Sequence, residues 1–517
     1  MGSRRLLALL TLGLLTAAAC GGSSAQREAL RVQSEGAAQT GAPDAGALAD
    51  DAGVGTDAGA AVPDASASAD ASSTPAAGGS TSAGAGPGSA SAPAAKAGGS
   101  ASTPAAKTGA GAQAPKSPSQ AASPVPGQPA PAPGAPAPGQ ATGGATDVGV
   151  TANSIKVGHI GIYSGPVGSF GDDLSYAGRA GMQLVNDTGG INGRKLEVLV
   201  RDDAWDGTKG MNAARDLVER QKVFAICCIM SVNTSDPLTP YADEKKIPHV
   251  GADGWGEPQY SGEWTFPVSA SAVVEAHMLA KYQAEKQGAK RIAILYINNP
   301  TGRAYVKAYD EVIKKFGGEV VFSQPATFDD PGTTTFIAQA RTQNIDTIST
   351  YLDPGIFARM VREAAAQNYK PKNAFSGAAG LFFEVTPNFT GPHAEGTIAA
   401  THWVTNDMDT PGLRSYKEVV ERYYPKIDHS TWTKAGYVGA TMFGNALKKL
   451  GLDVTRQRLK DEMDKVTNFD TGLGPTISFS PGKHRANKTI YLAQIQREGD
   501  KFAFKYLAGP LVDEYTE

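Results

Sequence analysis

Residues 155–203 read IKVGHIGIYSGPVGSFGDDLSYAGRAGMQLVNDTGGINGRKLEVLVRDD. The apolar run at 155–163 predicts a buried strand, residues 172–186 predict a helix that ends at a glycine pair, and 195–203 predict a second strand. A strand, a helix and a second strand at this spacing form a right-handed βαβ unit, because the crossover packs back onto the sheet only with that hand. This stretch therefore predicts an α/β fold built on a parallel sheet.

The same alternation of short apolar runs and longer amphipathic runs continues through most of the chain. Strands are expected at 223–230 and 247–252, and the pattern restarts with a helix at 271–287. The further strands and helices are expected at 291–297, 301–316, 319–324, 333–342, 346–352, 355–368, 374–377 and 396–403, followed by helices within 411–467 and closing strands at 476–480, 490–496 and 502–507. Two similar parallel sheets with helices on both faces are the predicted architecture.

The first 150 residues predict export and a tether. Residues 1–19 combine a basic start, an apolar run and small residues before Cys20, which is the pattern of a signal peptide followed by lipid attachment at Cys20. Residues 20–150 consist mainly of Ala, Gly, Ser and Pro and contain no aromatic residue. Such a composition buries too little apolar surface to offset the entropy of ordering, so a long disordered tether is expected. The chain is predicted to be an exported lipoprotein on the extracytoplasmic face of the cell membrane, with simple secretion as the alternative.

The composition and the motifs argue against several classes of function. The formal net charge is −3 and the chain has no basic run, which argues against nucleic-acid binding. The body after residue 150 has no complete GxGxxG, GxSxG, HExxH or P-loop motif, so we expect no cofactor, no metal and no enzymatic activity. Asp202 and Asp203 follow a strand and precede a helix, which favours turn and cap roles over a catalytic pair.

Polar loops rich in Ser, Thr, Asn, Asp and Gly follow the predicted strands. They lie at 164–173, 231–237, 251–257, 298–302, 352–355 and 376–382. In open α/β sheets, ligands lie outside the carboxyl ends of the strands, where these loops meet helix N-termini. Such N-termini favour an anion and could hold a ligand carboxylate without any arginine. The alternative is that these residues are ordinary caps and turns.

Several of these segments resemble the branched-chain amino-acid-binding family of type I periplasmic binding proteins. The resemblance rests on SGPVGSFG, NDTGGINGRKLEVLVRDD, KKIPHVGADG, GRAYVKAYDEVIKKFGGEVV and WTKAGYVGATMFGNALKKLG, and it covers residues 151–517. It implies two Rossmann-like lobes joined by a hinge of three crossovers, near 266–271, 400–406 and 475–480, which close on a ligand. The implied parts are lobe 1 at 151–269, lobe 2 at 270–400, a return to lobe 1 at 401–477 and a closing segment of lobe 2 at 478–517.

The resemblance also implies the residues that contact the ligand. By position they are Phe170, Ser231, Thr234, Ala252, Asp253, Gly254, Trp255, Thr301, Tyr351 and Asp353, with Ser231 and Thr234 placed to bind a ligand carboxylate. The family's acidic partner for the ligand ammonium is missing, because Ala378-Ala379-Gly380 follows the predicted strand at 374–377. Either Asp253 or Asp353 replaces that partner, or the ligand is an amide, a carboxylate or another small metabolite rather than an α-amino acid.

Cys227 and Cys228 are the only cysteines besides Cys20, and they are adjacent. They lie at the end of the strand predicted at 223–230, four and three residues before Ser231, so they are expected beside the pocket. In an oxidising compartment, three states remain open: a vicinal disulfide, two free buried thiols, or an intermolecular link. Adjacent thiolates rarely share one ion, and no histidine lies at a companion spacing, so a metal site is not expected.

Two functions fit these expectations. In the first, the chain is the extracytoplasmic receptor of an ABC importer, a monomer that binds a small amino-acid-like, amide or carboxylate solute and docks on membrane permease subunits. In the second, a lipoprotein of the same fold senses a ligand and signals to a partner without transport.

Overall fold

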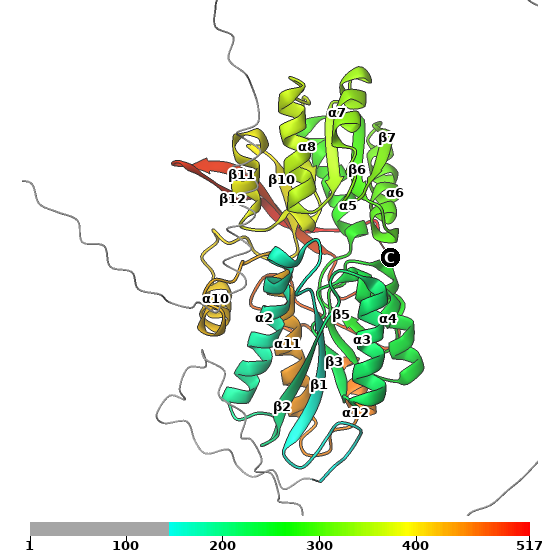
Figure 1. Ribbon diagram of the computed structural model, residues 1–517, viewed down its shortest axis with the longest axis vertical. Helices are drawn as coiled ribbons and strands as arrows, with labels where there is room; N and C mark the ends of the chain where they lie inside the picture. Colours follow the sequence, from blue (N-terminus) through cyan, green and yellow to red (C-terminus); the bar gives the residue numbers. More distant parts are fainter. Residues whose placement is uncertain (1–143, 517) are drawn as a thin grey trace, which may run out of the picture. The chain divides into compact units, whose positions relative to one another are not determined.

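The computed structural model describes residues 144–516, apart from the side chains of Ser169, Phe170 and Asp172 (Figure 1). The predicted signal peptide, the lipid-attachment residue Cys20 and most of the predicted tether lie outside the described residues. Within the described part, no helix combines the length and the apolar character that a membrane span requires.

The first sheet has five strands in the order β2-β1-β3-β4-β5, and all of its pairs are parallel. Its strands are β1 (Ser154–Gly161), β2 (Lys195–Asp202), β3 (Ala225–Cys227), β4 (His249–Ala252) and β5 (Thr265–Pro267). β1 and β2 pair along their full lengths, with Ser154 opposite Lys195 at one end. The two strands predicted within 155–203 are therefore confirmed as parallel neighbours. β5 is a strand that the sequence pattern did not indicate.

Helices cover both faces of the first sheet, as predicted. α2 (Gly168–Asp187) packs with α11 (Thr431–Lys449) on one face, and α3 (Gly207–Arg215) packs with α4 (Val232–Lys245) on the other (Figure 1). A π-helical turn at Asp216–Arg220 extends α3, and a 3₁₀ turn at Glu257–Ser261 precedes β5. The core between the sheet and α3/α4 includes Ile160, Leu217 and Ile226.

The second sheet has seven strands in the order β12-β11-β10-β9-β8-β6-β7. Its strands are β6 (Arg291–Ile297), β7 (Glu319–Ala326), β8 (Thr347–Tyr351), β9 (Ser376–Gly377), β10 (Ile398–Thr401), β11 (Thr489–Glu498) and β12 (Lys501–Val512). β11 is antiparallel to both β10 and β12, whereas the other pairs are parallel. The predicted parallel sheet is thus present, and a C-terminal hairpin extends it.

Helices also cover both faces of the second sheet. α5 (Ala272–Tyr282) packs with α6 (Pro300–Lys315), and α7 (Thr333–Thr342) packs with α8 (Pro354–Ala366). The remaining short elements are a π-helical turn at Gln283–Gln287, 3₁₀ turns at Ala379–Leu381 and Gly391–Ala394, and α9 (Thr386–Thr390). One apolar cluster continues from the α2/α11 face of the first sheet to the α5/α6 face of the second.

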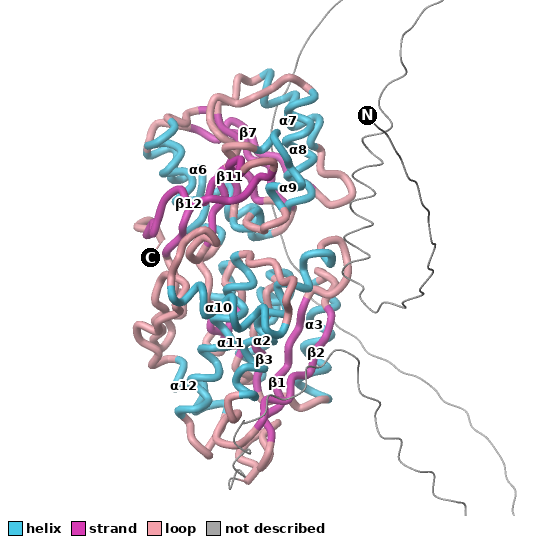
Figure 2. Tube along the Cα trace, turned by 90° about the vertical axis from the view of Figure 1, so that its left-hand side faces the viewer, coloured by secondary structure: helices cyan, strands magenta, loops and turns pink. Residues whose placement is uncertain are grey.

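The chain crosses between the two sheets three times. It leaves the first sheet between β5 and α5, returns between β10 and α10 (Pro411–Tyr423), and crosses again between α12 (Arg456–Met463) and β11. Figure 2 shows α10, α11 and α12 beside the first sheet, although they follow the central strands of the second sheet in the sequence. The two Rossmann-like halves joined by three crossovers are therefore present.

The strand predicted at 476–480 is wrong. That segment belongs to the third crossing and makes only isolated bridges, such as the one between Phe469 and Ile477. Ile477 and Phe479 are buried, and the ring of Phe479 lies 5.4 Å from that of Phe266. Its alternating apolar residues therefore anchor a crossing segment in the core and do not face one side of a sheet.

The strand predicted at 223–230 is shorter than expected. The regular ladder ends at Cys227, and Cys228 has a φ of 69°, which turns the chain away from the extended direction. The amide N–H of Cys228 still donates to the carbonyl of Val250 at 2.9 Å. The remaining apolar residues of this run are buried in the core beyond the end of the strand.

The start of the described chain is held against the first sheet, near the amino ends of β1 and β2. The Arg194 guanidinium donates to the carbonyl of Gly144 at 3.1 Å, and the Thr146 hydroxyl donates to the carbonyl of Val454 at 2.6 Å. The backbone N–H of Arg456 donates to the carboxylate of Asp147 at 2.7 Å. The chain therefore enters the folded part at the end of the sheet opposite to the carboxyl ends of its strands.

Glycines allow α11 to lie directly on β4. A Cβ atom at Gly439 would lie 2.8 Å from the Cα of Gly251, and one at Gly251 would lie 2.7 Å from the Cα of Gly439. Both distances are shorter than any relaxed contact between a Cβ atom and backbone, so the two backbones pack without a side chain between them.

We expect Gly439→Ala to destabilise the protein. In a free helix interior, alanine would be favoured over glycine by roughly 1 kcal/mol. Here the added methyl group overlaps the backbone of β4, so a net loss of about 1–3 kcal/mol in the free energy of unfolding is expected, measured as a lower thermal midpoint. Gly168→Ala is the control, because a Cβ atom there meets only Tyr163 backbone atoms at 3.7 Å. Equal midpoints for the wild type and Gly439→Ala would contradict the close contact.

Candidate functional site

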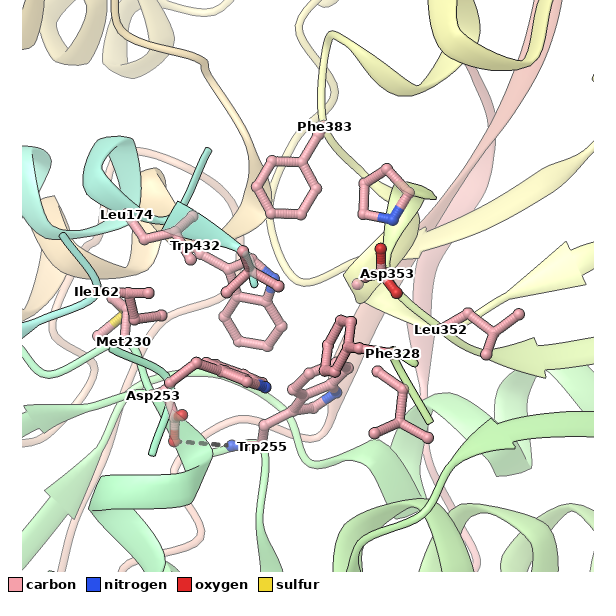
Figure 3. A pocket seen from close by; sticks show the side chains of 15 residues that line it. Ile162, Leu174, Met230, Asp253, Trp255, Phe328, Leu352, Asp353, Phe383 and Trp432 are labelled. Atoms are coloured by element: carbon pink, nitrogen blue, oxygen red, sulfur yellow. Dashed lines mark hydrogen bonds between the residues drawn. The ribbon is translucent and has the colours of Figure 1, made fainter. Parts of the chain in front are cut away.

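A cavity lies between the carboxyl ends of the strands of the two sheets (Figure 3). From the first half it is lined by Ile162, Val167, Leu174, Trp205, Met230, Asp253, Trp255 and Trp432, and from the second half by Ile297, Phe328, Leu352, Asp353, Pro354, Gly380 and Phe383. Most of these residues end a strand or lie in the loop that follows one. The cavity therefore lies where the general rule for α/β sheets expects a ligand.

The cavity is small in this state. Its volume is ≈ 40 Å³, in the measure in which one water molecule needs about 10 to 15 Å³. It has room for roughly three water molecules. A larger solute therefore enters only if the lining side chains move or the two sets of loops separate.

Aromatic rings form much of the wall. The ring of Trp255, which follows β4, lies 4.7 Å from that of Trp432 in the first turn of α11 and 4.5 Å from that of Tyr351 at the end of β8. Phe328 and Phe383 add two further rings from the second half (Figure 3). Such a wall favours an apolar or aromatic body in the ligand.

Gly380 provides the space that Trp255 occupies. A Cβ atom at Gly380 would lie 3.0 Å from the indole of Trp255 and 2.7 Å from the carbonyl oxygen of Leu352. An acidic side chain at this position would overlap both groups. The absence of a side chain at position 380 is therefore explained by the Leu352 carbonyl and the Trp255 indole that pack against it.

Asp253 is a buried carboxyl group on the wall of the cavity. It is 2% exposed, and its Oδ1 accepts hydrogen bonds from the side-chain amide of Gln259 and the backbone N–H of Trp255. The same Gln259 amide donates to Asp236 at 2.8 Å. Burial, and then the charge of Asp236, raises the pKa of Asp253 to about 8, and burial raises the pKa of Asp236 to about 6. Two carboxyl groups thus share one amide.

Asp353 is the second carboxyl group on the wall. It is the N-cap of α8, and its Oδ1 accepts from the backbone N–H groups of Gly355 at 2.8 Å and Ile356 at 3.3 Å. Its Oδ2 is buried and has no hydrogen-bond partner among the described residues. Burial raises the pKa of Asp353 above its ordinary value.

The structure brings three of the ten predicted ligand residues to the cavity, namely Asp253, Trp255 and Asp353. Tyr351 lies behind them, against the ring of Trp255. The remaining residues whose side chains are described are buried near the strand ends but do not line the cavity: Ser231, Thr234, Ala252, Gly254 and Thr301. Phe170 lies in the first turns of α2, and its side chain is outside the described part.

Other wall residues were not predicted. Trp205, Phe328, Phe383 and Trp432 each follow a strand or begin a helix. One signal for Trp432 was available, because it is one of only five tryptophans and opens the predicted return helix. Nothing in the local pattern of the other three distinguishes a wall residue from a core residue.

A buried histidine–carboxyl contact lies behind the cavity at the second crossing. The imidazole of His402 contacts the carboxylate of Glu275 on α5, and both side chains are fully buried. The second oxygen of Glu275 accepts from the backbone N–H of Ala379 at 2.9 Å, and the ring of His402 lies edge-on to Trp432 at 5.1 Å. This pair links the crossing segment to a helix of the second half.

Cys227 and Cys228 are joined in the structure by an S–S bond of 2.06 Å. Both residues are buried, and Cys228 lies against three glycines, Gly178 of α2, Gly251 of β4 and Gly439 of α11. The bond therefore lies where α2 and α11 cross the sheet, next to Met230 on the cavity wall. Within the described part, no group of His, Cys, Asp and Glu side chains is arranged to hold a metal ion.

Comparisons with known proteins agree with this architecture. A family model described as "Periplasmic binding protein" matches residues 154–501. The chain is 25% identical over 379 residues to "Leu/Ile/Val-binding protein homolog 7" of Brucella abortus (strain 2308), covering 70% of this chain and 93% of that protein.

Two solved structures share the fold. One is a branched-chain amino acid ABC transporter structure from Thermus thermophilus with bound valine, with a TM-score of 0.62, 18% identity and coverage of 72% and 98% of the two chains. The other is a solute-binding protein of an ABC transporter from Rhodopseudomonas palustris BisB5 in complex with 3,4-dihydroxy benzoic acid, with a TM-score of 0.62, 19% identity and coverage of 70% and 99%.

We expect Asp253→Asn to stabilise the protein, increasingly so as the pH rises. Between about pH 4 and pH 8 the folded protein keeps a proton on Asp253 that the unfolded chain has released, so this carboxyl group lowers stability as the pH increases. Asparagine keeps a side-chain oxygen that accepts the hydrogen bond from Gln259, but it has no ionisable group, so its contribution to stability does not change with pH. Thermal unfolding should show a gap in favour of the variant that widens from pH 5 to pH 8, on the order of 1–3 kcal/mol at the upper end. A gap that does not depend on pH would contradict the titration of Asp253.

The disulfide is tested by intact mass spectrometry. Purified protein should weigh two daltons less before reduction than after reduction in denaturant, because closing one S–S bond removes two hydrogen atoms. Replacing both cysteines with serine should abolish the difference. Equal masses before and after reduction would mean that the thiols are free.

Proposed function

Because the chain belongs to the periplasmic binding protein family, we propose that it is the extracytoplasmic solute-binding receptor of an ABC importer. The observation that carries this proposal is the enclosed cavity between the strand ends of two α/β halves that three crossings join. A solute held there contacts both halves at once. Its binding free energy can therefore favour a closed arrangement of the halves, which a membrane permease distinguishes from the open one.

The wall of the cavity supports a small solute with an apolar or aromatic body. Of the proteins named above, one is called a Leu/Ile/Val-binding protein homolog, one structure contains bound valine, and one is a complex with 3,4-dihydroxy benzoic acid. The rings of Trp255, Trp432 and Phe328 fit that range. We infer an amino-acid-like, amide or carboxylate solute, with Asp253, Trp255 and Asp353 as the main contacts.

The first 150 residues support a place outside the cytoplasm. The signal-peptide pattern of residues 1–19 favours export, and Cys20 is the proposed site of a lipid anchor. The partners that follow from this proposal are the solute, the permease subunits and the membrane surface. A receptor that docks one solute at a time requires no second copy, so the protein is proposed to act as a monomer.

Thermal shifts of the full-length chain test the proposed function. The panel contains amino acids, amides, amines, short carboxylates and aromatic acids. A ligand that binds only the folded state at a hundred times its Kd stabilises that state by about 2.7 kcal/mol, so at least one compound should raise the melting temperature by on the order of a few degrees. A panel without any response would refute solute capture. Binding without an uptake defect in a deletion strain would favour a sensor that signals without transport.

Trp255→Ala tests the position of the site. Removing an aromatic wall residue should weaken the binding of the responding solute by about tenfold to a hundredfold, measured by calorimetry. Phe389→Ala is the matched control, because Phe389 is an exposed aromatic residue on α9, 41% exposed, that does not line the cavity. Equal affinities for the wild type and Trp255→Ala would place the ligand elsewhere.

A further inference from the structure

Of the two side chains predicted to bind a ligand carboxylate, Thr234 is already hydrogen-bonded within the protein, whereas the buried hydroxyl of Ser231 has no partner among the described residues, and the neighbouring backbone N–H groups are occupied. The Thr234 hydroxyl donates to the carboxylate of Asp203 at 2.5 Å, and the backbone N–H of Gly254 donates to the side-chain oxygen of Gln259 at 2.9 Å. The backbone N–H of Trp255 donates to Asp253. A ligand carboxylate that displaced these partners would leave buried carboxyl and amide groups unpaired, which is costly.

The ionisable groups on the cavity wall are carboxyl groups, which are negative when ionised and neutral when protonated, so the wall offers no positive charge to a ligand carboxylate. Asp253 and Asp353 approach from different halves, on opposite sides of the cavity in Figure 3. Among the described wall residues, none is Lys, Arg or His. An anion in this cavity would therefore be desolvated beside two carboxyl groups without a compensating cation. A cation would gain from both carboxyl groups and from the faces of the surrounding aromatic rings.

Two polar atoms of the wall residues lack a partner in the described part of the chain. One is Oδ2 of Asp353, which can only accept when ionised, and the other is the indole Nε1 of Trp255, which can only donate. Both atoms are buried. A ligand that satisfies them must carry one donor for Asp353 and one acceptor for Trp255, and the absence of a cation on the described wall favours a neutral acceptor.

We propose that the solute is an organic ammonium with an apolar or aromatic body whose other polar group is a neutral acceptor, such as an amide or hydroxyl, and not a carboxylate. This inference rests on the proposed function and narrows its range of solutes. In the proposed complex, the ammonium group of the solute binds Asp353, and the carboxylate of Asp253 adds a second favourable charge. The indole N–H of Trp255 donates to the neutral acceptor.

Asp253 gives this binding a characteristic pH dependence. The ionisable groups around it are Asp236 on α4, Tyr260 on the 3₁₀ turn before β5 and Tyr351 on β8. Arg485 lies over the ring of Tyr260 at 4.1 Å, where it pairs with Glu257 at 2.5 Å. Burial and the charge of Asp236 raise the pKa of Asp253 to about 8 in these surroundings. An ammonium that enters the cavity favours the ionised form, so binding releases a proton and tightens as the pH rises.

The competing site for an anion is a helix N-terminus. α2 and α4 both begin near the cavity without a side-chain cap, and such an end attracts negative charge. The experiment therefore contains carboxylate probes of the same shape as the amine probes.

Four probes with the leucine skeleton separate the two polar groups of the ligand: leucinamide, leucine, 4-methylpentanamide and 4-methylpentanoate. The four phenylalanine counterparts repeat the test with an aromatic body. Calorimetry on the full-length chain should give the tightest binding for the amino amide in at least one series, about tenfold or more above the amino acid and the simple carboxylate. Between pH 5.5 and 7 its affinity should rise with pH, by up to about tenfold per pH unit for one released proton.

Asp353→Asn tests the ammonium contact. Asparagine caps a helix as well as aspartate does, so α8 should remain intact, as circular dichroism can verify. The variant should bind the amino amide about tenfold or more weakly and lose the preference for it over 4-methylpentanamide. Asp253→Asn should flatten the pH dependence. Asp206→Asn is the matched control, because Asp206 is the N-cap of α3 and does not line the cavity; its affinity should equal that of the wild type.

The outcomes distinguish this inference from the proposed function. Tighter binding of leucine, 4-methylpentanoate or their phenylalanine counterparts, or an unchanged affinity of Asp353→Asn, would overturn the inference and leave solute capture intact. The inference also fails, and solute capture stands, if none of the eight probes binds but another compound of the broad panel does. Failure of the whole panel would overturn both.

Discussion

The close packing of α11 on the first sheet is the constraint on which the site depends. Gly439 and Gly251 bring two backbones into contact, and Gly178 allows α2 to approach the Cys227–Cys228 bond in the same region. Because α11 can lie so near the sheet, Trp432 in its first turn reaches the cavity and contacts Trp255. A helix from the last quarter of the sequence, α11, thus belongs to the first half of the molecule. The part of the cavity wall that the first half contributes includes Trp432 and therefore forms only when α11 is packed on the sheet.

The carboxyl groups of the cavity have a different physical role. Asp253 is buried, and Asp236 and Asp353 are partly buried, in a region where the described wall residues carry no positive charge. Burial raises the pKa of all three carboxyl groups, so each lowers the stability of the protein when it is ionised. Sites that bind ligands often retain such unfavourable groups, because the ligand compensates them and a substitution that relieves them weakens binding. The hydrogen bond that Gln259 gives to both Asp253 and Asp236 limits the cost without removing it.

The sequence predicted the architecture well, because hydrophobic periodicity and turn residues report directly on strands and helices. The pairing of β1 with β2, the restart after 271–287 and the position of the cavity at the strand ends all followed from such patterns. The roles of individual side chains stay predictions, because they depend on partners that no local pattern reveals. Thr234 was assigned to a ligand, and its hydroxyl donates to Asp203, 31 residues away in the sequence.

Other differences have similar causes. Apolar and polar residues alternate at 476–480, as in a strand, because Ile477 and Phe479 enter the core. The segment is nevertheless no part of either sheet. The stretch Ala378-Ala379-Gly380 was interpreted as lacking an acidic residue, and the structure adds that a side chain at Gly380 would meet Trp255 and the carbonyl of Leu352.

The position at which the chain enters the folded part has a mechanical consequence. Arg194 and Arg456 hold this entry at the end of the first sheet opposite the cavity, so a force applied at Gly144 would load those two residues first and would not strain the loops that line the cavity.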